Sequence, residues 1–126
     1  MKNIRKIVHI RASMEEVFTA MTNPLSIELW SGYPAEMEAS PGTAFSMFDG
    51  DITGTLLAIE PPSRIEQQWD FGEHPAPSVA RIELSEEGNK TRIELNHSNV
   101  PDDAFDNINT GWKEYFFGAL KSYLED

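Results

Sequence analysis

The sequence predicts an α+β fold, in which a curved antiparallel β-sheet of about seven strands lies against one long C-terminal helix. Two observations predict this class. Between residues 33 and 98, segments that alternate apolar and polar residues are separated by short turns, which favours antiparallel hairpins. After residue 101, apolar residues recur at steps of three and four, which indicates a helix. The expected order is β-α-α-β6-α, over one domain of residues 1–126.

The N-terminal third predicts one strand and two short helices. Residues 4–10, IRKIVHI, place Ile4, Val8 and Ile10 in one phase, which Lys6 interrupts, and predict the first strand. A helix should follow, because Ser13 and Glu16 have the spacing of a capping box. Pro24 occupies the first position of a second helix, which Gly32 ends.

The middle of the chain predicts a series of strands with period two. Within residues 64–71, RIEQQWDF, the side chains of Ile65, Gln67 and Trp69 share one face of their strand. The sheet should therefore have one apolar face and one solvated face. The predicted strands are residues 33–39, 43–48, 52–60, 64–71, 78–85 and 91–98.

The last element is expected to begin near Asp102 or Asp103 and to cover the apolar face of the sheet. Gly111 and Gly118 lie inside it, and each costs about 1 kcal/mol relative to alanine, so we expect a close approach to the sheet or a bend. A sheet that holds a C-terminal helix in this way is a helix-grip architecture. The apolar stripe consists of Phe105, Ile108, Trp112, Phe116 with Tyr115, Ala119 and Tyr123.

Composition excludes several classes of function. The chain has no cysteine, so disulfides and thiolate chemistry are excluded, and its net charge of −11 opposes binding to nucleic acid. The N-terminus lacks the apolar core of a signal peptide, and no apolar run reaches the length of a membrane span. We therefore expect a cytoplasmic protein with no membrane insertion.

One segment imitates a calcium-binding loop. In DGDITGTLLAIE, Asp49, Asp51 and Glu60 fall at positions 1, 3 and 12 of an EF-hand loop. The flanking segments are strand-like, whereas an EF-hand needs a helix on each side. We interpret Asp49-Gly50 as a two-residue hairpin turn with positive φ at both positions, and we expect no metal site and no cofactor.

Two polar residues are expected on the apolar face. His97 is in phase with Ile93 and Leu95, and Gln67 is in phase with Trp69. Each is either a hydrogen-bonded core residue or a polar group that contacts a ligand. We predict no catalytic residues, because no serine lies near a histidine except Ser98, which points to the other face of its strand.

Large aromatic residues could line a cavity between the sheet and the helix, or they could fill a dry core. Both interpretations remain open. If a cavity exists, it would take an apolar small molecule. The candidate ligand-binding residues are Trp30, Tyr33, Gln67, Trp69, His97, Trp112, Phe116 and Tyr123.

Three stretches resemble the family of activators of heat-shock protein 90 ATPase homologues, within the START-related, birch-pollen-allergen-like superfamily. They are TNPLSIELW, MEASPGTAFSMFDGDITGTLLAIEPPSRIEQQWDF and GWKEYFFGALKSYL. The most specific positions are Gly42, Phe45, Asp49-Gly50, Gly54, Trp69 and the GW pair that begins the last stretch.

The resemblance implies the helix-grip fold and leaves two hypotheses about function. The first is a non-catalytic module that binds an apolar, lipid-like small molecule. The alternative is a co-chaperone-like protein that modulates a heat-shock protein 90 ATPase. Eukaryotic co-chaperones of the family carry an additional N-terminal domain with major chaperone contacts. We expect this chain to act without such a domain and to give weak stimulation at most.

Overall fold

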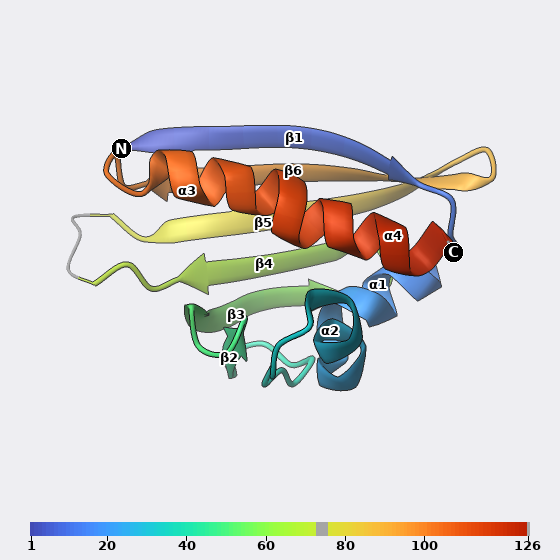
Figure 1. Cartoon of the computed structure of the whole chain (residues 1–126), viewed down its shortest axis with the longest axis horizontal. Coiled ribbons are helices and arrows are strands. Elements are labelled where there is room, and N and C mark those ends of the chain that lie inside the picture. Colours follow the sequence, from blue (N-terminus) through green and yellow to red (C-terminus); the bar gives the residue numbers. More distant parts are fainter. Residues whose placement is uncertain (73–75, 126) are drawn as a thin grey trace.

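A computed structural model describes residues 1–72 and 76–125, and it confirms the α+β helix-grip fold. One antiparallel sheet has the strand order β1-β6-β5-β4-β3-β2, and a long C-terminal helix lies along it (Figure 1). Strands β2 to β6 are sequential neighbours, and β1 pairs with β6 to form the far edge. The strands are β1 (Lys2–Ile10), β2 (Ala44–Met47), β3 (Ile52–Glu60), β4 (Arg64–Trp69), β5 (Ser78–Glu87) and β6 (Lys90–Val100).

The predicted strand over residues 33–39 is wrong, so the sheet has six strands. This segment makes only an isolated bridge, in which Glu36 and Ser46 exchange two backbone hydrogen bonds of 2.8 Å. Pro34 has no N–H to donate to a ladder. Its carbonyl instead accepts a hydrogen bond of 3.2 Å from the amide of Asp49, which ties the segment to the turn after β2.

The two short helices begin and end where their capping residues predict. α1 (Met14–Thr22) has the expected capping box, in which the amide of Glu16 donates to Ser13 Oγ at 3.1 Å. The Ser13 amide donates to Glu16 Oε1 at 3.3 Å. α2 (Pro24–Ser31) ends at Gly32, whose φ of 82° places it in the left-handed region that favours glycine.

The C-terminal helix changes its geometry in the middle. α3 (Phe105–Thr110) leads into a π-helical segment, η1 (Gly111–Gly118), which is followed by α4 (Ala119–Glu125). Hydrogen bonds from i to i+5 widen the turn, so later side chains are rotated relative to an α-helix. Among the residues described, no helix has both the length and the apolar composition needed to cross a membrane.

This wider turn corrects the predicted apolar stripe. Trp112 and Phe116 are buried as expected, but Phe117 and Leu120 are the next buried residues. Tyr123, which an α-helical period places inside, is 39% exposed, and Tyr115 is 64% exposed.

The two interior glycines do not approach the sheet, so that part of the prediction is wrong. A Cβ at Gly111 would meet nothing within 4 Å, and a Cβ at Gly118 would lie 3.0 Å from the Lys113 carbonyl oxygen of the same helix. A close approach occurs instead at Gly54 in β3, where a Cβ would overlap the carbonyl of Gln68 in β4. Only glycine fits at that position.

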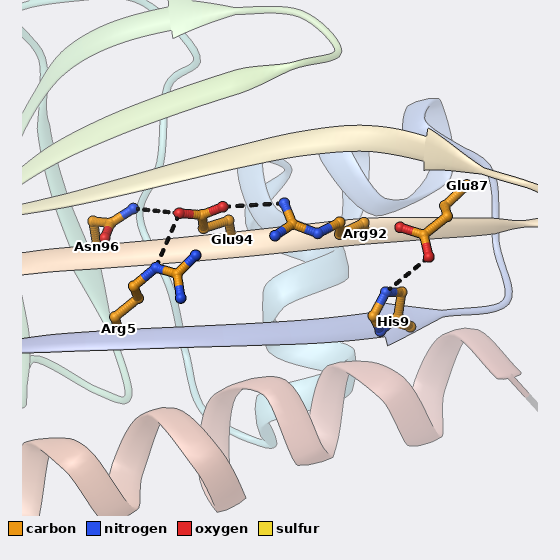
Figure 2. A network of polar contacts seen from close by, with 6 residues as sticks. All are labelled: Arg5, His9, Glu87, Arg92, Glu94 and Asn96. Atoms are coloured by element: carbon orange, nitrogen blue, oxygen red, sulfur yellow. Dashed lines mark hydrogen bonds and ion pairs between the residues drawn. The ribbon is translucent and has the colours of Figure 1, made fainter.

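The outer face of the sheet is polar, as the alternation predicts. Glu94 of β6 accepts hydrogen bonds from Arg5 at 3.3 Å, Arg92 at 3.0 Å and Asn96 at 3.1 Å (Figure 2). The bonds from Asn96 and Arg92 lower the pKa of Glu94. The outer face therefore carries solvated charged side chains. A site for an apolar ligand can form only on the opposite, apolar face, beneath the helix.

Candidate functional site

An open groove of about 570 Å³ lies between the C-terminal helix and the β2–β3 hairpin. We call it the aromatic groove. Phe48 and Ile52 line it from the hairpin, Tyr115 and Phe116 line it from the helix, and Trp69 lines it from the sheet. Its volume falls within the range of about 300–1,000 Å³ that is usual for small-molecule sites.

The turn between β2 and β3 places one wall of the groove. The expected positive φ is present at Asp49 (55°) and Gly50 (89°), and Phe48 also has a positive φ of 54°. The loop is longer than the two residues predicted. Met47 pairs with Ile52, so residues 48–51 form the loop. The EF-hand positions therefore lie on a hairpin turn and along β3, without the flanking helices that a calcium loop needs.

A continuous series of contacting aromatic rings lies along the floor of the groove and behind it. Trp69 stacks on Trp112 with ring centroids 5.0 Å apart and an interplanar angle of 26°. Trp112 lies 4.6 Å from Phe116, and Phe116 makes an edge contact with Trp30 at 4.9 Å. The indole N–H of Trp30 donates to the Ala20 carbonyl at 2.7 Å. Each aromatic pair contributes about 0.5–1.5 kcal/mol beyond its buried area. The Trp69–Trp112 pair therefore holds the helix to the sheet, and the Phe116–Trp30 pair holds it to α2.

His97 is 1% exposed, and the structure fixes its tautomer. The indole N–H of Trp112, which can only donate, lies 3.0 Å from His97 Nδ1, so Nδ1 accepts and carries no proton. The proton of the neutral ring is therefore on Nε2, which donates to Ser78 Oγ at 2.8 Å. Burial lowers the pKa of His97 to about 4, so the ring is neutral at pH 7.

Ser78 is the polar neighbour that the sequence analysis missed, and the expectation that only Ser98 lies near a histidine is wrong. In the β5–β6 register Ala80 is opposite His97, so Ser78 lies two residues further along the same face and reaches the ring diagonally. Ser78 Oγ also lies 3.3 Å from the Ser98 carbonyl, to which it donates. Because Nε2 already carries a proton, His97 cannot take the Ser78 proton as a general base.

Gln67 is buried beside the same rings. It is 1% exposed, and its Oε1 accepts a hydrogen bond of 3.0 Å from the indole N–H of Trp69. Within the described residues, no fully buried side-chain nitrogen or oxygen lacks a hydrogen-bond partner. Gln67 and His97 therefore serve as the polar partners of the two stacked tryptophans and lie behind the surface of the groove.

The structure brings half of the predicted ligand-binding residues together. Tyr33, Trp69, Trp112 and Phe116 line the aromatic groove, whereas Trp30, Gln67 and His97 lie among the residues packed behind it. Tyr123 lies elsewhere, in a separate depression beside α1. Ten other lining residues were not predicted from the sequence. Among them, the places of Phe48, Asp51 and Ile52 depend on the length of the hairpin loop, and those of Glu114 and Tyr115 depend on the π-helical phase.

Metal ligands are not gathered in the described part of the chain, where no group of three or more His, Asp or Glu side chains could hold an ion. His9 pairs with Glu87 at 3.4 Å on the outer face (Figure 2), and His97 is buried with two partners. The third histidine of the sequence, His74, and the adjoining Pro75 of a predicted turn lie outside the described residues.

A sheet that wraps a C-terminal helix and leaves a groove beside it defines a helix-grip protein. The sequence matches the family described as Activator of Hsp90 ATPase homolog 1-like protein over residues 11–125. The chain therefore belongs to this family.

Named relatives agree with the family. The chain is 27% identical over 111 residues to activator of 90 kDa heat shock protein ATPase homolog 1 of Mus musculus, which covers 86% of this chain and 33% of the relative. A corresponding protein of Dictyostelium discoideum is 24% identical and covers 95% of this chain and 32% of the relative. The chain thus spans about a third of the length of these relatives.

Solved structures share the fold over nearly the whole chain. An HSP90 activator from Plasmodium falciparum superposes with a TM-score of 0.88 at 25% identity, covering 97% of this chain and 95% of the other. The Aha1 dimer from Colwellia psychrerythraea superposes with a TM-score of 0.86 at 24% identity, covering 99% and 97%.

Proposed function

We propose that this chain is a single AHSA1-type domain, residues 1–126, which binds a cytoplasmic chaperone of the heat-shock protein 90 class and modulates its ATPase. The observation that carries the proposal is the match in fold and family to proteins named as activators of that ATPase. The HSP90 activator from Plasmodium falciparum supports it most directly, since the two chains cover each other almost completely.

We expect this chain to stimulate the chaperone ATPase only weakly. The relatives are about three times as long as this chain, so the matched region accounts for only part of their surface. The net charge of −11 favours contacts with a basic region of the partner. Such contacts between exposed charges are screened over about 10 Å at 0.1 M salt, so binding should weaken as salt is raised.

The test is an ATPase assay with a purified chaperone of this class, combined with a binding titration at several salt concentrations. A specific inhibitor of the chaperone gives the background activity. We expect salt-sensitive binding with weaker stimulation than a full-length activator gives. Absence of binding at every salt concentration would reject the proposal.

A second function is supported by the aromatic groove, which offers a site for an apolar small molecule. The groove is open rather than enclosed, and its walls are largely aromatic and aliphatic. Native mass spectrometry of freshly purified protein, followed by titration with the neutral dye Nile red, tests this function. We expect a retained molecule or saturable dye binding, which Tyr115→Ala and Phe48→Ala weaken because both residues line the groove.

A further inference from the structure

We propose that the aromatic groove prefers a small aromatic molecule that carries an ammonium group over neutral or anionic molecules of the same shape. This inference rests on the ligand-binding function proposed above and adds the charge of the ligand. It follows from two properties of the groove: the sign of the charges that line it and the nature of its rings.

The charged residues that line the groove are carboxylates. Among the described residues these are Asp51, which comes from the β2–β3 hairpin, and Glu114, which comes from η1, so each wall contributes one. Both are exposed, and within residues 1–72 and 76–125 neither forms an ion pair. An ammonium group in the groove would meet these two negative charges, whereas a carboxylate group there would be repelled by both.

The rings of the groove attract a cation independently of the carboxylates. The face of an aromatic ring carries partial negative charge, and a cation placed over it is stabilised. Tyr33 is 52% exposed and Tyr115 is 64% exposed, so both rings are accessible to a ligand from the opposite walls. Trp69, Trp112 and Phe116 are nearly buried and form an apolar floor for the aromatic part of the ligand.

The depression on the other side of the C-terminal helix does not share the acidic character of the groove. On the other side of the same helix, a second depression is lined by Lys6 and Val8 of β1 and by Lys113, Phe117 and Lys121 of the helix, and no described carboxylate lines it. The C-terminal helix therefore separates a basic depression from an acidic aromatic groove. Of these two depressions, the groove attracts an aromatic cation, whereas the lysines of the other repel it.

The test uses three indoles that differ in charge: tryptamine as the cation, tryptophol as the neutral molecule and indole-3-propionate as the anion. Binding is measured at pH 7 by NMR, from the indole N–H signals of Trp69 and Trp112. We expect tryptamine to bind about fivefold more tightly than tryptophol, with indole-3-propionate weakest, because exposed carboxylates and rings add modest stabilisation. Asp51→Asn with Glu114→Gln should lower the affinity for tryptamine to the smaller preference that the rings alone provide and leave the affinity for tryptophol unchanged.

A matched control removes the same charge elsewhere. Glu83 is exposed on β5 between the inward-facing Ile82 and Leu84, and Glu83→Gln should leave tryptamine binding unchanged. An equal loss in Glu83→Gln and Asp51→Asn would overturn the proposal in favour of general attraction by the net charge.

Two further outcomes distinguish failure of the charge preference from failure of the ligand-binding function. Equal affinities for the three indoles would overturn the charge preference while leaving the groove as a ligand site. No indole binding, together with perturbation of the Trp69 and Trp112 signals by the chaperone, would make the groove a protein-docking surface. Both this proposal and the ligand-binding function would then fail, and the chaperone proposal would stand.

Discussion

Aromatic side chains on the two sides of the C-terminal helix have different roles: on one side they pack in the core, and on the other they line the groove. On the side of β1, Phe117 is 2% exposed and its ring packs on Trp112 at 5.3 Å. On the side of the β2–β3 hairpin, Tyr115 is 64% exposed and lines the aromatic groove. These two residues are only two positions apart, so the direction of a side chain, rather than its type, decides whether it joins the core or the groove.

The π-helical segment explains this difference. In η1 both Phe116 and Phe117 are buried, which brings two consecutive rings against the sheet and leaves Tyr115 outside. π-helical turns are rare and are frequently found at functional sites. Here the turn allows one helix to seal the core on one side and to form the wall of a groove on the other.

The largest expected effect is on the free energy of unfolding, when a buried aromatic residue on the core side of the helix is truncated. Phe117→Ala and Trp112→Ala should each lower the free energy of unfolding by about 3–5 kcal/mol, because a large buried side chain is lost and a cavity remains. Tyr115→Ala should cost less than about 0.5 kcal/mol, because its ring is mostly exposed. Urea unfolding measures all three.

Two further variants are controls for the phase of the helix. Glu114 and Lys121 are exposed, and their alanine variants should also cost less than about 0.5 kcal/mol. Comparable losses in the free energy of unfolding for Phe117→Ala and Tyr115→Ala would show that the side-chain directions in η1 are wrong. The assignment of Phe117 to the core and Tyr115 to the groove would then be rejected.

Local signals in the sequence were sufficient for most of the fold. The capping box of Ser13 and Glu16 and the strand over residues 52–60 are present as predicted, because each depends on residues close together in the chain. The predicted strand over residues 33–39 failed because alternation alone does not show that Pro34 lacks the donor a ladder needs.

The candidate site was harder to predict because it depends on non-local geometry. A period of 3.6 residues places Tyr123 inside, but the π-helical turn buries Leu120 instead. The contact between Ser78 and His97 requires the register of β5 against β6, which hydrophobic alternation does not determine. Asp51 joins the groove only because the hairpin loop has four residues rather than two.

A smaller effect is expected on the pH dependence of stability, which tests the buried His97 beneath the helix. His97 has a pKa lowered to about 4 by burial, against about 6.5 in an unfolded chain. The unfolded state therefore binds more protons below pH 6.5, so stability falls as pH is lowered and the loss is complete near pH 4. We expect a loss of about 1.5 kcal/mol between pH 6.5 and pH 5.

Urea unfolding across this pH range measures the loss, and His97→Gln provides the control because it removes the titrating ring. The variant should be less stable than wild type at pH 7 but should show a flatter pH dependence above pH 5. The lowered pKa values of Glu94, Asp102 and Glu125 add their own loss only at lower pH, as those carboxylates become protonated. Parallel curves for wild type and His97→Gln between pH 6.5 and pH 5 would contradict a buried neutral histidine.

The smallest expected changes in the free energy of unfolding are at the two glycines of the helix, which lie on its two sides. Gly111 lines the aromatic groove, has helical φ and ψ of −58° and −45°, and leaves open space for a Cβ. Gly111→Ala should therefore raise the free energy of unfolding by about 0.5–1 kcal/mol, because alanine reduces the entropy of the unfolded chain. At Gly118, beside β1, a Cβ would lie 3.0 Å from the Lys113 carbonyl oxygen, so Gly118→Ala should lose this gain or reverse it. Thermal and urea unfolding of both variants decide the matter: equal stabilisation at the two positions would mean that the π-helical turn leaves as much room at its end as at its start.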